Sequence, residues 1–201
     1  MSGSTNFMAK MKDAELISSE VLVAAPKRFM REVLRMPDGY EIDWYYVDTT
    51  PSVMVVPVTD EGNVILVRQY RHNLKRQTLE LPAGIVSAGE PTEAAAIREL
   101  EEETGHKLRE GAQLVPLGPF YSLPSETNKY VHFFLASPVV FSAQASGDTE
   151  IEKYFDMSIV EMPFDEAFAN IGREINGLET AAALLLAHQV RQTTPREEPR
   201  R

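Results

Sequence analysis

Residues 84–106 of this chain read GIVSAGEPTEAAAIRELEEETGH, and they decide its fold. Strong helix formers fill residues 94–104. Pro91 stands where the first turn of a helix begins, and Gly105 stands where a helix ends, because glycine readily takes the left-handed conformation that closes a helix. The stretch therefore predicts a helix over residues 94–104.

Glutamates crowd this helix: residues 90–103 hold six of them and a single base, Arg98. Glu99, Glu102 and Glu103 are three and four positions apart, so their carboxylates share one face. Like charges at these spacings cost about 0.2–0.5 kcal/mol a pair, and anions near a helix C-terminus cost about 0.3–1 kcal/mol more. Oxygen ligands without Cys or His suit a hard cation such as Mg²⁺ or Mn²⁺. We therefore expect a metal site here rather than a solvated acidic face.

The other faces of the helix carry their own expectations. Thr92 and Ala95 fall over the acidic sector one and two turns earlier, and both are small, so that sector is expected to be open. Ala96, Ile97 and Leu100 form the apolar sector, which we expect to enter the core.

The wider spacing is more specific than the acidic cluster. Gly84, Glu90 and the run RELEEETG at residues 98–105 reproduce the Nudix box at every charged and glycine position, and the chain resembles a Nudix hydrolase. The one departure is His106, where the pattern has an aliphatic residue. The resemblance implies an α+β protein with a Nudix-type α/β/α sandwich built on a mixed sheet.

Two neighbouring segments extend the resemblance. RQYR at residues 68–71 and ELPAG at residues 80–84 look like the branch that cleaves ADP-ribose and related nucleoside diphosphate sugars. That branch hydrolyses the diphosphate bond to a nucleoside monophosphate and a sugar phosphate. The resemblance implies the same reaction here, with Mg²⁺ as cofactor or Mn²⁺ in its place.

The resemblance also assigns roles to residues. Four groups are expected to hold the metal: the carboxylates of Glu99, Glu102 and Glu103 and the carbonyl of Ala83. Glu90 and Arg98 are expected to orient the loop and the helix through a charge-assisted pair rather than to touch substrate.

A further carboxylate on a loop late in the chain is expected to act as general base. The segment SAQASGDTEIE at residues 142–152 has the right composition, and Glu150 is the first choice, with Asp148 and Glu152 as alternatives. Each of these acids taken alone is also compatible with a plain solvated charge.

Arg71 and Arg68 are candidates for the substrate diphosphate, because a guanidinium matches phosphate oxygens bidentately. On an alternating strand, side chains three positions apart point to opposite faces, so one of the two must point away. Arg71 is the favoured candidate.

Two aromatic residues and one acid complete the predicted substrate contacts. Trp44 and Tyr46 lie on one face of a predicted strand, where they either pack in a core or stack on a nucleobase. Glu126 follows Ser125, which replaces a glycine of the related loop, and it is either a ligand for distal hydroxyls or a surface acid.

Composition narrows the class of protein. The chain has 201 residues, a formal net charge of −10 and no cysteine. The negative charge is the wrong sign for a module that covers nucleic-acid phosphates. Absence of cysteine excludes disulfides, thiol nucleophiles and thiolate zinc sites, and also the isopentenyl diphosphate isomerases of the same fold. No apolar run is long enough for a membrane span, so we expect a cytoplasmic protein that binds neither nucleic acid nor membrane.

The chain is expected to divide into a flexible arm (residues 1–7), a small antiparallel sheet (8–48), a catalytic domain (49–192) and a flexible tail (193–201). A sheet of this size is not expected to be stable by itself, so we expect it to form the interface of a homodimer and to contact substrate. The predicted strands are three within residues 19–48 and one each at 52–58, 63–70, 78–81, 129–136 and 151–158; the predicted helices beyond the first cover 164–171 and 178–192.

Two other functions remain open at this point. The chain could be a Nudix-fold module that senses a nucleotide without catalysis, but the intact acids of the box argue against this. It could also hydrolyse nucleoside triphosphates, dinucleoside polyphosphates or capped RNA. The negative charge argues against long RNA, and the N-terminal sheet argues against a minimal triphosphatase.

Overall fold

The computed structural model describes residues 10–24, 27–145, 154 and 156–193. The chain divides into two compact units. The smaller unit comprises Met1–Thr50 together with Tyr121–Lys129, and the larger comprises Pro51–Phe120 together with Tyr130–Arg201. The division falls two residues after the predicted one and assigns a loop from the middle of the chain to the smaller unit. The predicted arm at residues 1–7 and residues 194–201 of the predicted tail lie outside the described residues.

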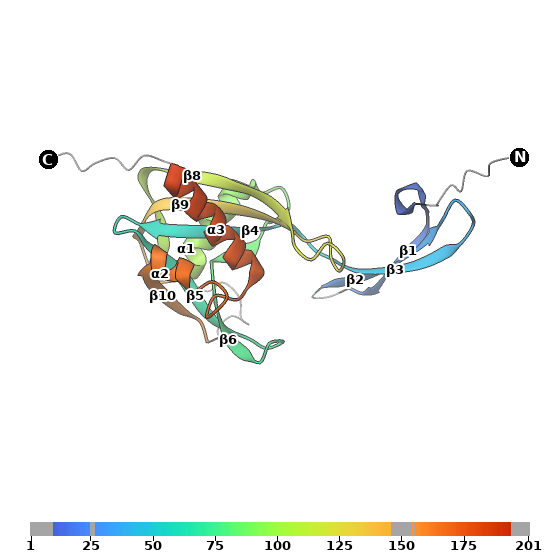
Figure 1. Cartoon of the computed structure of the whole chain (residues 1–201), viewed down its shortest axis with the longest axis horizontal. Helices are drawn as coiled ribbons and strands as arrows, with labels where there is room; N and C mark the ends of the chain where they lie inside the picture. Colours follow the sequence, from blue (N-terminus) through green and yellow to red (C-terminus); the bar gives the residue numbers. More distant parts are fainter. Residues whose placement is uncertain (1–9, 25–26, 146–153, 155, 194–201) are drawn as a thin grey trace, which may run out of the picture. The chain divides into compact units, whose positions relative to one another are not determined.

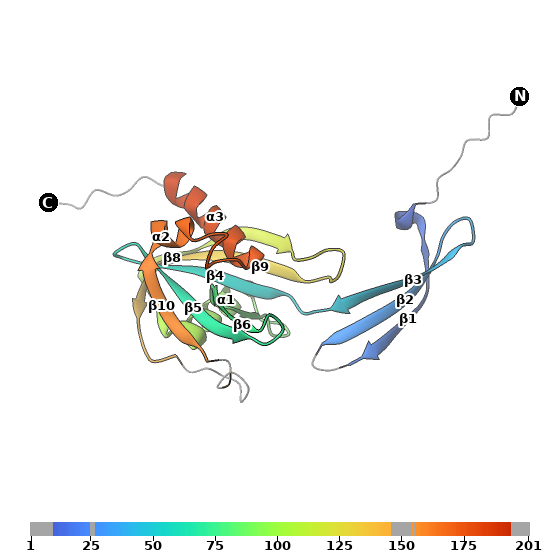
Figure 2. The ribbon, with the colours of Figure 1, turned by 60° about the horizontal axis from the view of Figure 1, so that its bottom comes forward.

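The smaller unit is built on a three-stranded antiparallel sheet in the order β1-β2-β3, which Figure 2 shows side by side. Its elements are the 3₁₀ turn η1 (Met11–Asp13), β1 (Glu15–Val23), β2 (Arg28–Arg35) and β3 (Glu41–Asp48). The small antiparallel N-terminal sheet predicted from the sequence is confirmed.

Alternation gives this sheet two different faces. On one face Arg31 pairs with Glu20 at 2.8 Å and Asp43 at 2.7 Å, and Arg35 pairs with Glu41 at 3.0 Å. Trp44 and Tyr46 alternate with these acids on β3 and therefore lie on the opposite face. All nine residues of β1 are exposed within the described structure.

The larger unit contains a mixed sheet. Its strands are β4 (Ser52–Thr59), β5 (Asn63–Arg71), β6 (Arg76–Glu80), β7 (Ala83–Ile85), β8 (His106–Tyr121), β9 (Tyr130–Phe141) and β10 (Ser158–Pro163). The order is β10-β5-β4-β9-β8, with β6 beside β5 and β7 beside β4. The β4–β9 pair is parallel, whereas β4–β5 and β4–β7 are antiparallel.

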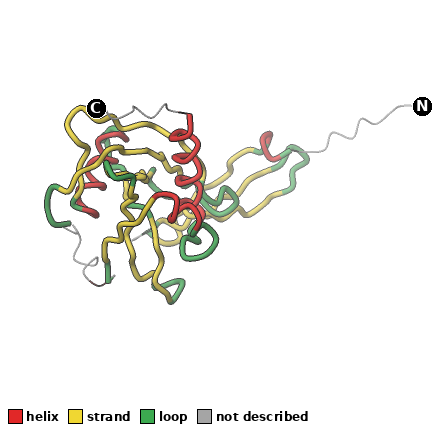
Figure 3. The backbone as a smooth tube through the Cα atoms, turned by 60° about the vertical axis from the view of Figure 1, so that its left-hand side comes forward, coloured by secondary structure: helices red, strands yellow, loops and turns green. Residues whose placement is uncertain are grey.

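Helices cover both faces of this sheet because β4 buries both of its own faces. Val53 and Val55 pack in one core with Leu100 of α1 (Thr92–Thr104), and Met54 and Val56 pack in another with residues of α2 (Phe164–Ala169) and α3 (Leu178–Thr193). In Figure 1, α3 crosses in front of the strands and α1 lies behind them, and in Figure 3 red helices flank the yellow strands. The predicted α/β/α sandwich is confirmed.

The sequence prediction missed β7 and β8 and placed one further strand differently. Of the strand predicted at residues 151–158, residues 151–153 and 155 lie outside the described residues, residues 154, 156 and 157 are not in a strand, and Ser158 begins β10, which runs to Pro163. The long β8 was not predicted, because its sequence HKLREGAQLVPLGPFY contains two glycines and two prolines and mostly half-exposed or exposed side chains, which obscures the alternation of a strand.

Helix α1 begins two residues before the predicted start and ends where predicted. Gly105 adopts a φ of +69°, and its N–H donates to the carbonyl of Glu101 at 2.9 Å. A Cβ at this position would lie 1.9 Å from the carbonyl oxygen of Ala143, so only glycine fits.

Two expectations about the faces of α1 were wrong. Ile97, expected in the core, is 36% exposed, and Ala95, expected on an open acidic face, is fully buried. The reason is that α1 approaches the sheet through its alanines, which lets the helix lie close to β4. Ala95 therefore lies on the same side of the helix as Glu99 and Glu103, which follow it by four and eight positions.

None of the helices in the described ranges is long and apolar enough to cross a membrane.

Candidate active site

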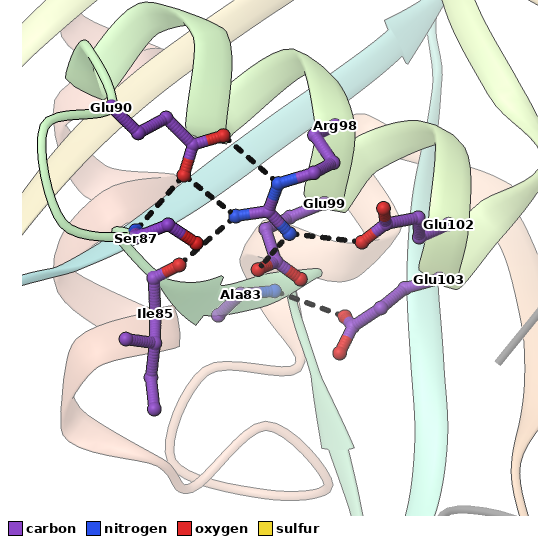
Figure 4. Close-up of polar contacts among 8 residues, drawn as sticks. All are labelled: Ala83, Ile85, Ser87, Glu90, Arg98, Glu99, Glu102 and Glu103. Carbon is purple, nitrogen blue, oxygen red and sulfur yellow. Dashed lines mark hydrogen bonds and ion pairs between the residues drawn. The ribbon is translucent and has the colours of Figure 1, made fainter. Parts of the chain in front are cut away.

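Helix α1 and the short strand β7 meet at a cluster of carboxylates, shown in Figure 4. Gly84 of β7 lies opposite Val53 of β4. A Cβ on Gly84 would lie 1.9 Å from the carboxyl carbon of Glu99. The Glu99 carboxylate therefore occupies the space that any other residue at position 84 would fill, and it is only 12% exposed. The glycine of the box thus makes room for the acid.

The second acid that faces β7 is Glu103. Its Oε2 accepts a hydrogen bond from the backbone N–H of Ala83 at 3.0 Å. Glu99 and Glu103 are one turn apart, and they contact neighbouring residues of the same strand. The structure therefore places the main chain of Ala83 and two of the three predicted metal-binding carboxylates together.

Arg98 links the remaining acids of the box. Its Nη1 donates to Glu99 at 2.7 Å and to Glu102 at 2.9 Å, and its Nε and Nη2 donate to the two oxygens of Glu90, each at 2.9 Å. Its Nη2 also donates to the carbonyl of Ile85 at 3.0 Å. One guanidinium thus ties the loop before the helix, strand β7 and the helix together.

Glu90 carries the clearest electrostatic signature of the cluster. The hydrogen bonds from Arg98, together with the backbone N–H of Ser87 at 2.9 Å, lower the pKa of Glu90 to about 2. Arg98 in turn has its own pKa raised by Glu90, Glu99 and Glu102. The structure brings Glu90 and Arg98 together as the pair that the sequence predicts.

The cluster fits a hard cation by its chemistry. Its donors are carboxylate and main-chain oxygens, with no sulfur or imidazole among them, and Gly84 holds the Glu99 carboxylate beside the main chain. Within the described ranges no three acidic or histidine side chains are grouped as a ready metal site. Arg98 donates to one oxygen of Glu99 and one of Glu102, and the Ala83 N–H donates to one oxygen of Glu103.

The two candidate arginines of β5 point to opposite faces. Arg71 pairs with Glu80 of β6, its Nε lying 2.9 Å from Oε1. Glu80 raises the pKa of the Arg71 guanidinium, and the charges of Glu103 and Glu179 add to this. Arg71 is an even number of positions from Ile65, which packs in the same core as Leu100 of α1, so Arg71 lies on the α1 side of the sheet. Arg68 instead pairs with Glu174 at 3.3 Å. The expectation that one arginine points away is met by Arg68.

Glu80 was named in the sequence only as part of the ELPAG segment, with no role of its own. Thr78 and Glu80 alternate on β6, and β6 is antiparallel to β5 with Gln69 opposite Thr78. This pairing places Gln69, Arg71, Thr78 and Glu80 on one face of the two strands. The signal in the sequence was the alternation of residues 78–80 (TLE) on the strand that pairs with residues 68–71 (RQYR).

Trp44 and Tyr46 line a pocket inside the smaller unit. Its volume is about 360 Å³, and its other lining residues are Glu32, Tyr121, Pro124, Ser125, Thr127 and Asn128. Trp44 is 41% exposed, so it does not belong to a closed core. Ser125, the departure from the related loop, contributes to the wall of this pocket.

Glu32 was missed by sequence reasoning and is the acid of this pocket. It accepts a hydrogen bond from the Tyr46 hydroxyl at 3.0 Å. The pKa of Tyr46 is raised, mainly by burial and secondly by this hydrogen bond. The predicted acid Glu126 does not line the pocket; its side chain is exposed, and its carbonyl accepts from the N–H of Val47 at 2.9 Å.

His106, which stands where the box has an aliphatic residue, is buried. The residue is 8% exposed, its Nδ1 lies 2.9 Å from the Thr104 carbonyl, and its ring meets the ring of Phe141 edge-on at 5.6 Å. The three candidate bases, Glu150, Asp148 and Glu152, lie outside the described residues.

A mixed sheet between helices, with an acid-rich helix packed against a glycine of a short strand, defines the Nudix-type class of α/β/α proteins. The profile of the NUDIX domain matches residues 48–177. The chain belongs to the NUDIX family, and its relatives identify it as a pyrophosphohydrolase similar to ADP-ribose pyrophosphatases.

The individual relatives are as follows. ADP-ribose pyrophosphatase from Bacillus subtilis (strain 168) is 32% identical over 154 residues, covering 76% of this chain and 80% of the relative. ADP-ribose pyrophosphatase from Mycobacterium tuberculosis is 34% identical over 191 residues, covering 94% and 88%. A solved structure described as an ADP compounds hydrolase superposes with a TM-score of 0.77 at 21% identity, covering 94% of this chain and 99% of its own, which shows the shared fold.

Proposed function

We propose that this protein hydrolyses the diphosphate bond of a nucleoside diphosphate sugar, ADP-ribose or a close analogue, with Mg²⁺ as cofactor. The observation that carries the proposal is the packing of Glu99 and Glu103 against Ala83 and Gly84 on the face that also holds Arg71. The names of the relatives from Bacillus subtilis and Mycobacterium tuberculosis support the choice of ADP-ribose.

Three carboxylates and one carbonyl would hold the cation: those of Glu99, Glu102 and Glu103, and that of Ala83. When bound, the cation supplies positive charge that offsets the diphosphate and the acids and polarises the P–O bond. Glu90 holds Arg98 in place from the loop side, so that the guanidinium limits the repulsion between Glu99 and Glu102. Mn²⁺ would fit the same oxygen donors.

The reaction itself needs a water molecule and a base. We assign the base to Glu150, with Asp148 and Glu152 as the alternatives, because a carboxylate near the substrate accepts the proton that water loses as it attacks phosphorus. The bond between one phosphorus and the bridging oxygen breaks. Both products therefore leave with a phosphate, as a nucleoside monophosphate and a sugar phosphate.

Substrate recognition is assigned to four side chains of different character. Arg71 would contact the diphosphate, and Arg68 would not, since it pairs with Glu174 on the opposite face. Trp44 and Tyr46 would stack on the nucleobase in the pocket of the smaller unit. Glu126, whose side chain is exposed, would accept hydrogen bonds from distal hydroxyls.

Assembly and location complete the proposal. The exposed sheet of β1–β3 would serve a homodimer, because a three-stranded sheet with one strand exposed along its whole length has apolar side chains to cover. Residues 49–192 would form the catalytic domain and residues 8–48 the dimerisation and substrate-contact sheet, with flexible segments at 1–7 and 193–201. The protein would act in the cytoplasm.

One incubation tests the function. The protein with Mg²⁺ is offered ADP-ribose, GDP-mannose, UDP-glucose, diadenosine polyphosphates and nucleoside triphosphates in parallel, and products are identified by mass. The proposal expects the highest kcat/KM for a nucleoside diphosphate sugar. Faster turnover of triphosphates or dinucleoside polyphosphates would replace the substrate class, and binding without turnover of any compound would favour a sensing module.

A further inference from the structure

Glu80 is the only carboxylate in residues 63–80, which form the β5–β6 hairpin. Its two oxygens accept from Arg71 Nε at 2.9 Å and Arg71 Nη2, from the Thr78 hydroxyl at 2.6 Å and from Gln69 Nε2 at 3.4 Å. The side chain is only 18% exposed. A carboxylate held by three residues of two paired strands has a fixed position, and so does the arginine that it holds.

We propose that Glu80 is a positioning residue, which holds Arg71 so that the open edge of its guanidinium faces the substrate diphosphate. Glu80 acts through Arg71 and does not itself contact the substrate or a metal. This inference rests on the proposed function, because it requires Arg71 to bind the diphosphate.

The geometry of the guanidinium explains why one edge stays available. Arginine carries five N–H donors in a planar fork. Glu80 takes the side edge, formed by Nε and Nη2. The end edge, formed by Nη1 and Nη2, is the pair of donors that matches two oxygens of a phosphate. Because Glu80 binds the side edge of the Arg71 guanidinium, the donors of its end edge can still bind a phosphate.

Glu80 also keeps Arg71 away from the metal-binding acids. Arg71 lies in the field of Glu103 and Glu179, which attract it. Without Glu80, the guanidinium would turn toward the nearest remaining carboxylate, and Glu103 is one of the proposed cation ligands. The carboxylate on β6 therefore has two consequences: it orients Arg71, and it leaves Glu103 for the cation.

The same strand provides a matched comparison. Arg68 and Glu174 also form an Arg–Glu pair of β5, but through one contact of 3.3 Å, with the Glu174 side chain 60% exposed. No hydroxyl or amide of the described residues fixes that glutamate in the way that Thr78 and Gln69 fix Glu80. Glu174→Gln removes an ion pair of the same type without touching the proposed site.

The test is a double-mutant cycle on the full-length protein. We measure kcat and KM for ADP-ribose with Mg²⁺ in Glu80→Gln, Arg71→Ala and the double variant. We expect Glu80→Gln to lower kcat/KM by about 10- to 100-fold, because a misplacement of about 1 Å has effects of this size. The double variant should equal Arg71→Ala, since Glu80 has nothing to position once Arg71 is gone. Glu174→Gln should stay within about twofold of the parent.

Three readouts separate positioning from other roles. Glu80→Asp, which keeps the charge, should recover part of the rate lost in Glu80→Gln at an unchanged melting temperature. Binding of Mn²⁺, followed by electron paramagnetic resonance, should be weakened in Glu80→Gln, because Arg71 then competes for Glu103, and should return to the parent value in the double variant with Arg71→Ala. Mn²⁺ binding that stays weak in the double variant would make Glu80 a metal ligand, and additive losses in the cycle would make it act independently of Arg71; either result overturns the proposal.

Binding measurements keep the inference testable if ADP-ribose is not the substrate. The Nε–H resonance of Arg71 is followed by ¹⁵N NMR while ADP and Mg²⁺ are added. We expect ADP to shift this resonance in the parent and in Glu174→Gln, and its Kd to rise at least fivefold in Glu80→Gln. Failure of hydrolysis with this shift intact would refute the substrate and retain the positioning role. If the Arg71 resonance changes neither on addition of ADP nor in Glu80→Gln, the positioning role of Glu80 is overturned.

Discussion

Arg31 in the smaller unit and Arg98 in the larger unit make chemically similar contacts in different surroundings. Each donates to several carboxylates at 2.7–2.9 Å. The acids around Arg31, Glu20 and Asp43, are 52% and 50% exposed, whereas those around Arg98 are between 12% and 24% exposed. The two networks have similar contact distances and differ in the exposure of their acids to water.

Exposure decides what each network can do. Water and salt screen exposed pairs, so their contribution to stability is small even at ideal distance. Half-buried acids are screened less, and removing their common partner leaves them to repel one another. The network of Arg98 therefore matters for the position of the carboxylates proposed to bind the cation, whereas the network of Arg31 is an exposed surface network.

The largest expected contrast is catalytic. Glu103→Gln keeps the shape of the side chain but removes the charge proposed to bind the cation, so the rate should fall by at least about 10²-fold at saturating Mg²⁺. Asp43→Asn removes a charge of the same size from the network of Arg31, and its rate should stay within about twofold. Steady-state kinetics check both, and a Glu103→Gln rate within threefold of the parent contradicts the ligand assignment.

The next effect tests the space beside Glu99. Gly84→Ala places a methyl group where the Glu99 carboxylate lies, so that acid must move and activity should fall by roughly 10²-fold. Gly177→Ala is the control, because its Cβ would meet only the Thr180 hydroxyl at 3.8 Å. Equal activity of the two alanine variants would show that Glu99 has another productive position.

Stability should separate the two arginines. Arg98→Ala leaves Glu90, Glu99 and Glu102 without the guanidinium that they share. The free energy of unfolding should fall by roughly 2 kcal/mol, less than the roughly 3–5 kcal/mol lost when a fully buried pair is broken. For a protein of this size that lowers the melting temperature by about 4–8 °C. Arg31→Ala should leave the melting temperature unchanged. Calorimetry of the two variants measures the difference, and equal shifts would remove the distinction drawn from exposure.

The smallest effect is that of the cation on the folded protein. Glu99, Glu102 and Glu103 repel one another, so Mg²⁺ at ten times its Kd should add about 1.4 kcal/mol and raise the melting temperature by about 3–6 °C. The comparison is made against NaCl of matched ionic strength, and repeated in Glu99→Gln/Glu103→Gln, where the increment should vanish. Equal melting temperatures in the two salts would mean that the cation binds only together with substrate.

The sequence predicted best where local signals agree. The end of α1, the β4–β5 hairpin and the sandwich follow from helix formers, Gly105 and β-branched runs, each of which acts within a few residues. Ile97 and Ala95 were misjudged because the depth at which a helix approaches a sheet depends on the size of side chains on both, which a helical projection does not contain.

The candidate site shows the same limit. The spacing of Glu99 and Glu103 could be deduced from the chain, but their contacts with Gly84 and Ala83 join residues 15 and 20 positions apart through a strand of only three residues. Glu80 and Glu32 were missed because their importance comes from the residues across the sheet, Arg71 and Tyr46, rather than from their neighbours in sequence.

Hydrolysis of ADP-ribose in H₂¹⁸O with Mg²⁺ tests most directly the claim that the carboxylates of α1 serve attack on a diphosphate. Mass spectrometry identifies the products and the position of the label. The account predicts AMP and ribose 5-phosphate, with one ¹⁸O in one of the two phosphate groups and loss of this reaction in Glu103→Gln. ADP and free ribose, with the label on the sugar, would contradict it.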